Sequence, residues 1–527
     1  MIIDVAEVPF ERESTLRSTI CVIGAGAAGL TVTRELARRG VDVIVLEAGG
    51  LKETKRSQQV YAGDKTGQNY FKLEHARKRY LGGSTNCWAG LCAKLRPLDF
   101  ETRSWIPHSG WPISRSDIDP YYDRAGEWLG IGGFHPQLDL PREKDQHLSG
   151  PGLKVDGFES VFFQMSKPAR LGEEWREELH AQEEVRLLVN ANVTHLQLSP
   201  DGQRLQHVTC QPFDGAPFKV QAEHFVLACG GIENPRMLLN ARDISSEGIG
   251  NQRGLVGRFF MEHPHIDRES IWIPAGAVPS LAHYHRRTRP RRKDRIWPYL
   301  RPRAEQLAEE ELLDFSLVLF KRSSIDKEAK QHPLLREMFQ SSEHLYRAGK
   351  TESKGEARSL KHLYTFGNPM EQSPNPDSRV SLSPRGERDE LGLIRLQLDW
   401  RLSPLEKRTL RRGHEMIAEA FATADYGRVR VTPTRTPTTF PKQTKGGYHH
   451  MGTTRMSETE TTGVVDRHCK VFGVSNLFVG GSSVFTTSGA ANPTLTIVAL
   501  ALRLAEHLHH LVTQAEAPVE TRKSREK

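Results

Sequence analysis

The sequence predicts an α/β fold in which a mainly parallel sheet is accompanied by a second domain with an antiparallel sheet. Residues 20–23 and 41–46 form two short, continuous apolar runs, and a helical pattern that ends at Gly40 lies between them. Continuous apolar strands of this kind are typical of parallel sheets that are covered on both faces. Two more such strands, at residues 224–229 and 476–479, are expected to join the same sheet. The first domain is therefore predicted to be discontinuous in the chain.

The segments between these strands have a different character. Residues 99–133 are rich in Trp, Pro and Tyr, and residues 379–382 and 393–399 alternate apolar with polar side chains. Such alternation favours strands with one face toward solvent, which are common in antiparallel sheets. These segments are the candidates for the second domain.

The composition excludes several classes of protein. The 527 residues contain 37% hydrophobic and 26% charged side chains, with a mean hydropathy of −0.53, so neither a membrane bundle nor a disordered chain is expected. The 73 Lys and Arg against 65 Asp and Glu give a net charge of +8, which is too modest to call for nucleic acid as a partner. The longest apolar run near the C-terminus, residues 495–502, stops at Arg503 and is far shorter than a membrane span.

The cysteines and the first residues bear on the cellular compartment. The first twenty residues contain four acidic side chains and no continuous apolar core, so no secretory signal is expected. The six cysteines include no CxxC pair, and three of them, Cys21, Cys210 and Cys229, lie in strand-like apolar surroundings. This pattern is typical of buried, reduced thiols, and we therefore expect a cytoplasmic protein without a metal site.

Gly24, Gly26 and Gly29 form a GxGxxG pattern between the first strand and the helix that follows it. Rossmann-like dinucleotide sites use glycine here because the turn is tight and the backbone approaches a pyrophosphate at the helix N-terminus. Glu47 ends the second strand, eighteen residues beyond Gly29, where a carboxylate can accept hydrogen bonds from a ribose. An acidic residue argues against a 2′-phosphate, which leaves NAD and the AMP half of FAD as candidates.

Four further motifs distinguish these two cofactors. They are GGSTNCW at residues 82–88, ACGGIENPR at residues 228–236, YHHMGT at residues 448–453 and GAANPT at residues 489–494. In this order, together with the GxGxxG pattern, they resemble the glucose-methanol-choline (GMC) family of FAD-dependent oxidoreductases. Within that family, the chain looks most like the pyranose oxidase and glucoside 3-dehydrogenase branch. The features behind this are the Asn-Pro ending, EQ before PNP at residues 371–376, and GLVG before EHP at residues 254–264.

The resemblance implies a discontinuous, Rossmann-like FAD-binding domain and an α+β substrate-binding domain. We expect the FAD-binding domain to comprise residues 15–100, 186–266 and 445–513, and the substrate-binding domain to comprise residues 101–185 and 267–444. An N-terminal arm (residues 1–14) and a disordered tail (residues 514–527) complete the expected organisation.

The resemblance also implies which residues contact FAD. They are Gly24, Gly26, Gly29, Glu47, Gly82, Gly83, Ser84, Asn86, Cys87, Trp88, Ala228, Gly230, Gly481, Asn492, Pro493 and Thr494. Some relatives place a histidine that bonds covalently to the flavin at the position of Cys87. Because a thiol stands there in this chain, we expect noncovalent FAD, with a cysteinyl link as the alternative.

The family pattern places the catalytic imidazole directly after the aromatic residue of YHHMGT, which selects His449 rather than His450. An imidazole titrates near neutrality and can act as a base for a hydroxyl proton. Asn492 occupies the position of its catalytic partner and can donate to the substrate oxygen without competing as a base. Asn before Pro is also a helix N-cap pattern, and both roles are compatible. Candidate substrate contacts are Glu371, Gln372 and His450.

These features imply the oxidation of a secondary CH–OH of a sugar or glycoside to a ketone, by proton abstraction and hydride transfer to flavin N5. Oxygen or another electron acceptor, either a molecule or a protein, would complete the cycle. Three alternatives remain open: a non-sugar alcohol or a sterol as substrate, a lyase or photoenzyme that retains the flavin, and an electron-transfer protein. If the protein hands electrons to a partner protein, that partner could dock on the basic run at residues 286–303, which is otherwise read as a solvated loop.

Overall fold

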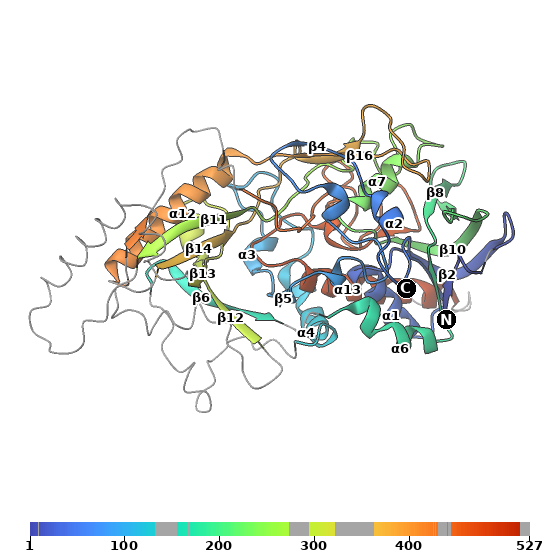
Figure 1. Ribbon diagram of the computed structural model, residues 1–527, viewed down its shortest axis with the longest axis horizontal. Coiled ribbons are helices and arrows are strands. Elements are labelled where there is room, and N and C mark those ends of the chain that lie inside the picture. The colour runs from blue at the N-terminus through green and yellow to red at the C-terminus, as the bar shows by residue number, and fades with distance from the viewer. Residues whose placement is uncertain are drawn as a thin grey trace, which may run out of the picture.

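The computed structural model describes residues 1–8, 10–131, 155–165, 169–272, 295–321, 363–424, 426, 428–430, 440 and 444–516. Two bodies lie at opposite ends of the long axis (Figure 1). The first body is built around an eight-stranded sheet, and the second body around a four-stranded antiparallel sheet. The predicted pairing of a parallel and an antiparallel domain is thus present.

The large sheet brings together strands from across the chain. Its parallel part joins β1, β7, β3, β2, β10 and β18, while β9 and β8 extend it in antiparallel fashion from β10. The strands are β1 (Ile2–Asp4), β2 (Thr15–Ile23), β3 (Val43–Leu46), β7 (Val185–Val189), β8 (Val193–Leu198), β9 (Leu205–Cys210), β10 (Phe218–Leu227) and β18 (Leu477–Val479). The prediction that four distant apolar runs form one sheet is confirmed.

The C-terminal helix α13 (Thr494–Glu516) packs against α1 (Ala27–Ala37) and α4 (Asp119–Trp128). Its stretch Thr494–Gln514 is the one helical segment in the described residues that is long and apolar enough to span a membrane, and 61% of it is buried. Its apolar composition is explained by this packing, because a helix enclosed on several sides needs apolar residues around most of its circumference.

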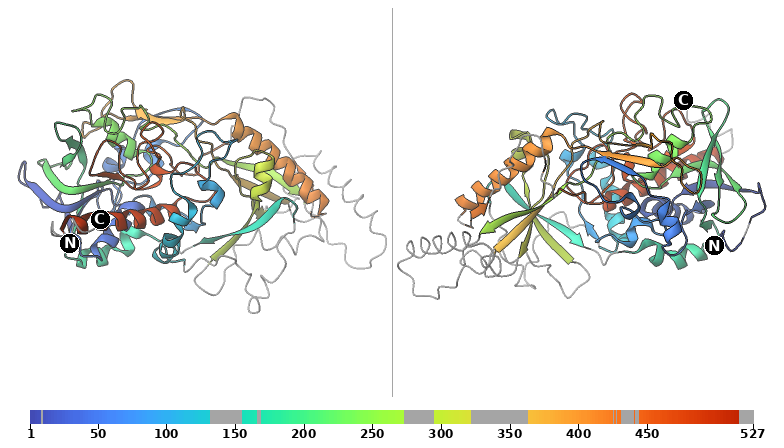
Figure 2. Two further views of the ribbon diagram at one scale, coloured as in Figure 1. Left: turned by 180° about the vertical axis from the view of Figure 1, so that it is seen from behind. Right: turned by 45° about the horizontal axis from the view of Figure 1, so that its top comes forward.

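The second body lies under the long helix α12 (Pro404–Thr423), as two further views show (Figure 2). Its sheet has the order β13 (Val318–Lys321), β14 (Leu363–Pro369), β11 (His265–Trp272) and β17 (Arg428–Arg430). Ser403 and Glu406 form a capping box at the start of α12, and Phe315, Met370 and Phe421 belong to the apolar core of this body. A separate three-stranded sheet contains β5 (Leu91–Cys92), β6 (Phe158–Met165) and β12 (Arg295–Pro302).

The remaining described helices and strands are short. They are α2 (Lys55–Gln59), β4 (Asp64–Gly67), α3 (Pro97–Phe100), α5 (Leu171–Glu174), α6 (Arg176–Ala181), α7 (Glu233–Asn240), α9 (Ala304–Glu309), β15 (Arg379–Leu382) and β16 (Leu396–Trp400).

The structure corrects the expected boundaries in four places. The predicted N-terminal arm contributes an edge strand, because β1 pairs with β7. Only the start of the Trp- and Tyr-rich segment contacts the second body, through Arg103 and Trp105, whereas α4 packs on α13 in the first body. The two alternating segments pair as β15 and β16 but join β4 in a sheet of their own rather than the sheet under α12. Finally, α13 continues to Glu516, beyond the expected start of the tail.

The basic run is only partly described. Residues 286–294 lie outside the described part of the chain, as do residues 517–527 of the predicted tail. Within the described part, Arg301 is 3% exposed and forms an ion pair with Asp314. At this position the expectation of a solvated loop is wrong, because the guanidinium lies in the core.

Candidate active site

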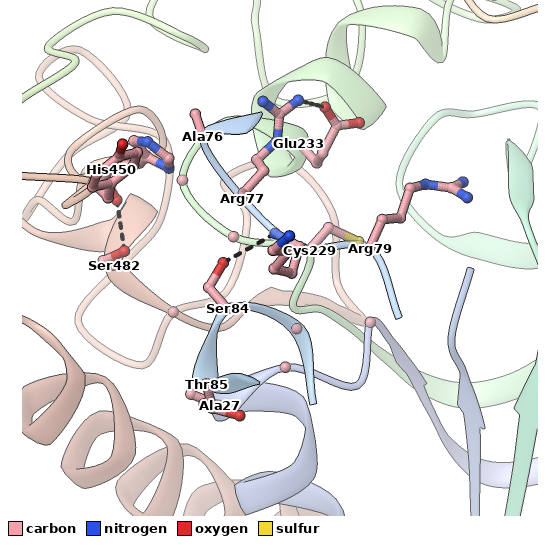
Figure 3. A pocket seen from close by; sticks show the side chains of 18 of the residues that line it. Ala27, Ala76, Arg77, Arg79, Ser84, Thr85, Cys229, Glu233, His450 and Ser482 are labelled. Carbon is pink, nitrogen blue, oxygen red and sulfur yellow. Dashed lines mark hydrogen bonds and ion pairs between the residues drawn. The ribbon is translucent and has the colours of Figure 1, made fainter. Parts of the chain in front are cut away.

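A cavity of about 930 Å³ opens where the carboxyl ends of four parallel strands meet. The first residues after β2, β3 and β10 line it, as does the segment after β18, through Gly24, Glu47, Ala228 and Gly481. Ligands of open α/β sheets bind at this edge, and cofactor pockets usually have volumes of roughly 300–1,000 Å³. Figure 3 shows part of this wall, with Ala27, Ser84 and Thr85 near the start of α1 and His450 and Ser482 across the cavity.

The three glycines of the GxGxxG pattern have different roles. Gly24 has a φ of +100°, and a Cβ there would lie 2.7 Å from the carbonyl oxygen of Ala228. A Cβ on Gly29 would lie 1.8 Å from the carbonyl oxygen of Gly24, so Gly29 allows α1 to pack closely on the turn. A Cβ on Gly26 would meet nothing within 4 Å, and Gly26 lines the cavity. Gly24 and Gly26 thus form a backbone wall open to a ligand, whereas Gly29 does not line the cavity.

Glu47 is held rigidly at the end of β3. Its Oε2 accepts a hydrogen bond from the Ala25 amide at 2.9 Å, and its Oε1 accepts one from the Gly49 amide at 2.8 Å. Burial raises the pKa of Glu47, and these two amides oppose that shift. Each carboxylate oxygen has further acceptor capacity, which is available to hydroxyl groups in the cavity.

The GGSTNCW segment supplies one face of the cavity. Gly83, Ser84, Cys87 and Trp88 line it. Gly82 and Asn86, like Gly29, do not line it. Gly82 has a φ of +94°, and the Asn86 amide donates to the carbonyl of Leu81 at 2.8 Å, so both shape the turn rather than face the cavity. For Gly29, Gly82 and Asn86, the expected contact with a ligand is replaced by a supporting role.

His449 and Asn492 lie side by side in the cavity wall. Nε2 of His449 lies 3.2 Å from Nδ2 of Asn492, and both residues line the cavity, as do Gly230, Pro493 and Thr494. Burial lowers the pKa of His449 well below its usual range, and the neighbouring histidines contribute in the same direction. The ring is therefore neutral at physiological pH and able to accept a proton.

Asn492 does not act as the N-cap that the sequence pattern suggests. Helix α13 begins at Thr494, and the carbonyl of Pro493 accepts the first helical bond from the Ile497 amide at 2.8 Å. Pro493 therefore occupies the capping position. Asn492 lies one residue earlier, where its side chain is directed to His449 instead of to the helix.

A buried carboxylate organises the loop that carries His449. Oε2 of Glu262 accepts hydrogen bonds from the amides of His263, Gly447 and His449 at 3.1, 2.9 and 3.0 Å. Its Oε1 bonds to the hydroxyl of Tyr70. The motif Glu262-His263-Pro264 stands out in the sequence, but no local pattern assigns a role to its first two residues, because their partners lie far along the chain.

The ring of His450 is hydrogen-bonded in a different network from the ring of His449. Its Nε2 lies 2.8 Å from the hydroxyl of Tyr70, which in turn bonds to Glu262. Burial lowers the pKa of His450 to about 3. Although His450 contributes to the lining of the cavity, its ring nitrogen is engaged in this network, and the role of His449 as the base stays a prediction.

Glu371 and Gln372 are not substrate contacts. Both are fully buried, and neither lines the cavity. Glu371 forms a bidentate pair with Arg103. Gln372 accepts hydrogen bonds from the Glu262 amide at 3.0 Å and from the Trp400 indole at 2.9 Å. The expectation that these polar side chains bind hydroxyl groups is wrong, because their hydrogen-bonding capacity is used within the protein.

The lining also holds several charged residues to which the sequence motifs give no role. Arg77 pairs with Glu233 at 2.5 Å (Figure 3). Glu233 also pairs with Arg236, which binds Asp389 at 2.6 Å. Arg79 also lines the cavity and donates to Asn192 at 2.8 Å. Among the described residues, no group of three or more His, Cys, Asp and Glu side chains is arranged to hold a metal ion.

The buried Glu262 makes the stability of this loop depend on pH. Burial raises the pKa of Glu262 to about 7, so between its unfolded pKa of about 4.3 and pH 7 the folded chain binds more protons than the unfolded chain. Its contribution to stability is therefore present at low pH and is lost as pH rises through 7. Relative to Glu262→Gln, the parent should lose roughly 3 kcal/mol of unfolding free energy between pH 5 and pH 8. Denaturant titrations of both proteins over this range measure the difference, and parallel pH profiles would contradict the expectation.

Comparisons with known proteins agree with this arrangement. The family model described as FAD dependent oxidoreductase matches residues 19–311, more than half of the chain, and the model described as GMC oxidoreductase matches residues 374–501. The 6′′′-hydroxyparomomycin C oxidase of Streptomyces lividus is 24% identical over 93% of this chain and 91% of its own length. The C-glycoside 3-oxidase of Arthrobacter globiformis is 46% identical over 68 residues, 13% of each chain.

A solved structure of formate oxidase has the same fold. It superposes with a TM-score of 0.57 at 15% identity, and the match covers 96% of this chain and all of the other. Together with the glycine-lined cavity at the strand ends, these similarities assign both the cofactor and the reaction class. The chain belongs to the GMC family of FAD-dependent oxidoreductases, enzymes that bind FAD and act on CH–OH groups.

Proposed function

We propose that the protein oxidises a secondary CH–OH group of a sugar or glycoside to a ketone. The observation that carries this proposal is the pair of His449 and Asn492, 3.2 Å apart in the wall of the cavity. A neutral imidazole next to a neutral amide provides a base and a hydrogen-bond donor at one point, which is what the removal of a hydroxyl proton requires.

The cavity fits FAD in size and in the chemistry of its walls. Gly24, Gly26 and Gly83 offer backbone without side chains, and Glu47 offers carboxylate oxygens. These residues, together with Ser84, would hold the dinucleotide. When bound, FAD supplies the oxidant that accepts the hydride from the carbinol carbon.

His449 takes the hydroxyl proton on Nε2, and Asn492 holds the oxygen. The amide nitrogen of Asn492 is a donor, so it can hydrogen-bond to the substrate oxygen and give up its contact with Nε2 of His449 when the proton arrives there. As the hydroxyl proton moves to Nε2, negative charge grows on the oxygen, and the Asn492 donor stabilises it. The depressed pKa of His449 keeps the base form dominant in the resting site.

The class of substrate is supported by the relatives and by the cavity mouth. Relatives named for oxidising aminoglycosides, fructose and C-glycosides match this chain. Next to His449, Phe71 and Tyr448 stack with ring centroids 4.0 Å apart, and both line the cavity. Flat apolar surface beside polar groups suits a ring that carries both C–H and O–H bonds. Oxidation at C3 of a glycoside is the position proposed.

The test is an anaerobic spectrum of the purified protein with a panel of monosaccharides, glycosides, sterols and simple alcohols. We expect glycosides or sugars to bleach the flavin band and to give a keto product that NMR of the sugar ring locates at C3. Bleaching only by sterols or simple alcohols would replace the substrate class. A flavin that no compound bleaches would favour a lyase or photoenzyme.

The reoxidation step is proposed to use oxygen or another acceptor, either a small molecule or a protein. Mixing the substrate-reduced protein with air-saturated buffer, and separately with a quinone under argon, compares the two routes. Faster return of the flavin band with oxygen would identify an oxidase, and faster return with the quinone a dehydrogenase.

The FAD is expected to be noncovalent. Cys87 faces the cavity, and partial desolvation raises the pKa of its thiol, so little of the nucleophilic thiolate is present at neutral pH. Acid precipitation of the yellow protein should therefore leave all of the flavin in the supernatant, where its absorbance is measured. Flavin fluorescence that stays with the denatured chain, and disappears in Cys87→Ser, would show a cysteinyl link instead.

A further inference from the structure

Two histidine rings and two other polar groups form a continuous chain of hydrogen bonds behind the cavity. Nε2 of His263 lies 3.3 Å from the backbone carbonyl oxygen of Ser488, and Nδ1 of His263 lies 2.9 Å from Nδ1 of His449. The chain ends at Asn492, which lies 3.2 Å from Nε2 of His449. His263 is 1% exposed and does not line the cavity, so it reaches a ligand only through His449.

We infer that His263 is a positioning residue that fixes the tautomer of His449, so that the lone pair of the base lies on Nε2. This inference rests on the proposed role of His449, and it adds a residue to which neither the motif nor the family match gives a role. The inference follows when a donor and an acceptor are assigned to each hydrogen bond of this series, beginning at Ser488.

Only one assignment of donors and acceptors is possible when the rings of His263 and His449 are both neutral. The carbonyl of Ser488 can only accept, so Nε2 of His263 carries the hydrogen. A neutral imidazole has one N–H, and Nδ1 of His263 must therefore accept from Nδ1 of His449. Nε2 of His449 then has no hydrogen, and it faces the amide hydrogens of Asn492. Burial supports the neutral forms, since it lowers the pKa of His263 to about 4 and that of His449 well below its usual range.

The surrounding backbone keeps the two rings in register. Met261 and Met451 exchange both backbone hydrogen bonds, at 2.9 and 3.0 Å, and Glu262 accepts from the amides of both His263 and His449. At the other end, Ser488 is fully buried, and its hydroxyl accepts from the Gln372 amide at 3.0 Å. The backbone carbonyl of Ser488 is thus fixed in place, and so is the His263 ring that donates to it.

The consequence is a base that needs no change of tautomer before it acts. With the opposite tautomer, Nε2 of His449 would carry a hydrogen, could not accept the hydroxyl proton, and would be opposed by the amide of Asn492. A catalytic histidine held in the wrong tautomer is known to cost about 10⁴-fold in rate in other enzymes. Once His449 is protonated, its Nδ1–H remains paired with Nδ1 of His263, which keeps the cation hydrogen-bonded.

The tautomer is measured directly by proton–nitrogen correlation spectra of the FAD-bound protein with ¹⁵N-labelled histidine rings. The signals of His449 are identified by their loss in His449→Ala. We expect the parent to show His449 protonated on Nδ1 and His263 protonated on Nε2. The opposite pattern, or a doubly protonated His263 at pH 7, would overturn the inference. This measurement needs no substrate turnover, so its outcome does not depend on whether a substrate has been found.

Two variants separate positioning from simple loss of structure. His263→Ala removes the acceptor, and we expect His449 to show a mixture of tautomers and flavin reduction to slow at least 100-fold. In His263→Asn, the side-chain oxygen can replace Nδ1 as acceptor, and the parent tautomer should return with a rate within tenfold of the parent. His414→Asn, which alters another buried histidine on α12, is the control. A His263→Ala protein that keeps both tautomer and rate, or an Asn variant no better than Ala, would refute the role.

Discussion

His449→Ala should leave the protein yellow but slow the reduction of its flavin by roughly 10²–10⁴-fold, the usual contribution of a positioned general base. FAD binding should survive because the glycine wall and Glu47 lie on other segments of the cavity. The alanine removes Nε2 of His449, the ring nitrogen that lies 3.2 Å from Nδ2 of Asn492. Stopped-flow mixing with the bleaching substrate under anaerobic conditions measures the rate.

His450→Gln is the matched control for this experiment. The His450 ring is hydrogen-bonded to Tyr70 rather than to Asn492, and its substitution should slow flavin reduction less than His449→Ala does. If His449→Ala reduced its flavin as fast as the parent, or if His450→Gln had the larger effect, the assignment of the base would be wrong.

Arg103→Ala should destabilise the protein by roughly 3–5 kcal/mol, because removing one partner of a buried ion pair leaves the other charge uncompensated. The Arg103 side chain is 1% exposed, its partner Glu371 is fully buried, and the two meet in a bidentate pair. The freed charge would lie near other buried carboxyl groups, because burial and the neighbouring carboxyl groups of Asp314 and Glu371 raise the pKa of Asp99. Denaturant unfolding followed by tryptophan fluorescence measures the loss.

Arg401→Ala provides a surface control. Arg401 pairs with Asp399 at 2.8 Å, but its side chain is 55% exposed, and water screens such a pair. Its unfolding curve should overlay that of the parent. The double variant Arg103→Met, Glu371→Met should recover much of the stability lost in Arg103→Ala, since neither charge of this pair is left without its partner. Equal unfolding midpoints for Arg103→Ala and Arg401→Ala would contradict this interpretation of the Arg103 pair.

The parts of the fold that the sequence predicts are those with a local signature. The four predicted strands of the parallel sheet, β2, β3, β10 and β18, each contain a short continuous apolar run, and the turn after β2 needs glycine at Gly24 for its positive φ. The end of each strand then determines which residues face the cavity. This is why Glu47 and Ala228 could be placed from the sequence, whereas the edge strand β1, only three residues long, could not.

The parts that the sequence does not predict depend on partners far along the chain. Glu371 and Gln372 look like polar residues at the end of a strand, yet Arg103 lies 268 residues away from Glu371. His263 and His449 are 186 residues apart and still meet at 2.9 Å. A motif can identify His449 as the base. The ring that holds it becomes visible only when the two loops are placed side by side.

The cavity depends on segments that lie far from the dinucleotide fingerprint. Strand β18 fits beside β10, and His449, Asn492 and the start of α13 complete the cavity, so these walls come from the last sixth or so of the 527 residues. A chain truncated before Leu477 has the GxGxxG turn but lacks strand β18, Asn492 and the start of α13. Such a truncated protein should therefore be colourless, even though the dinucleotide fingerprint is intact.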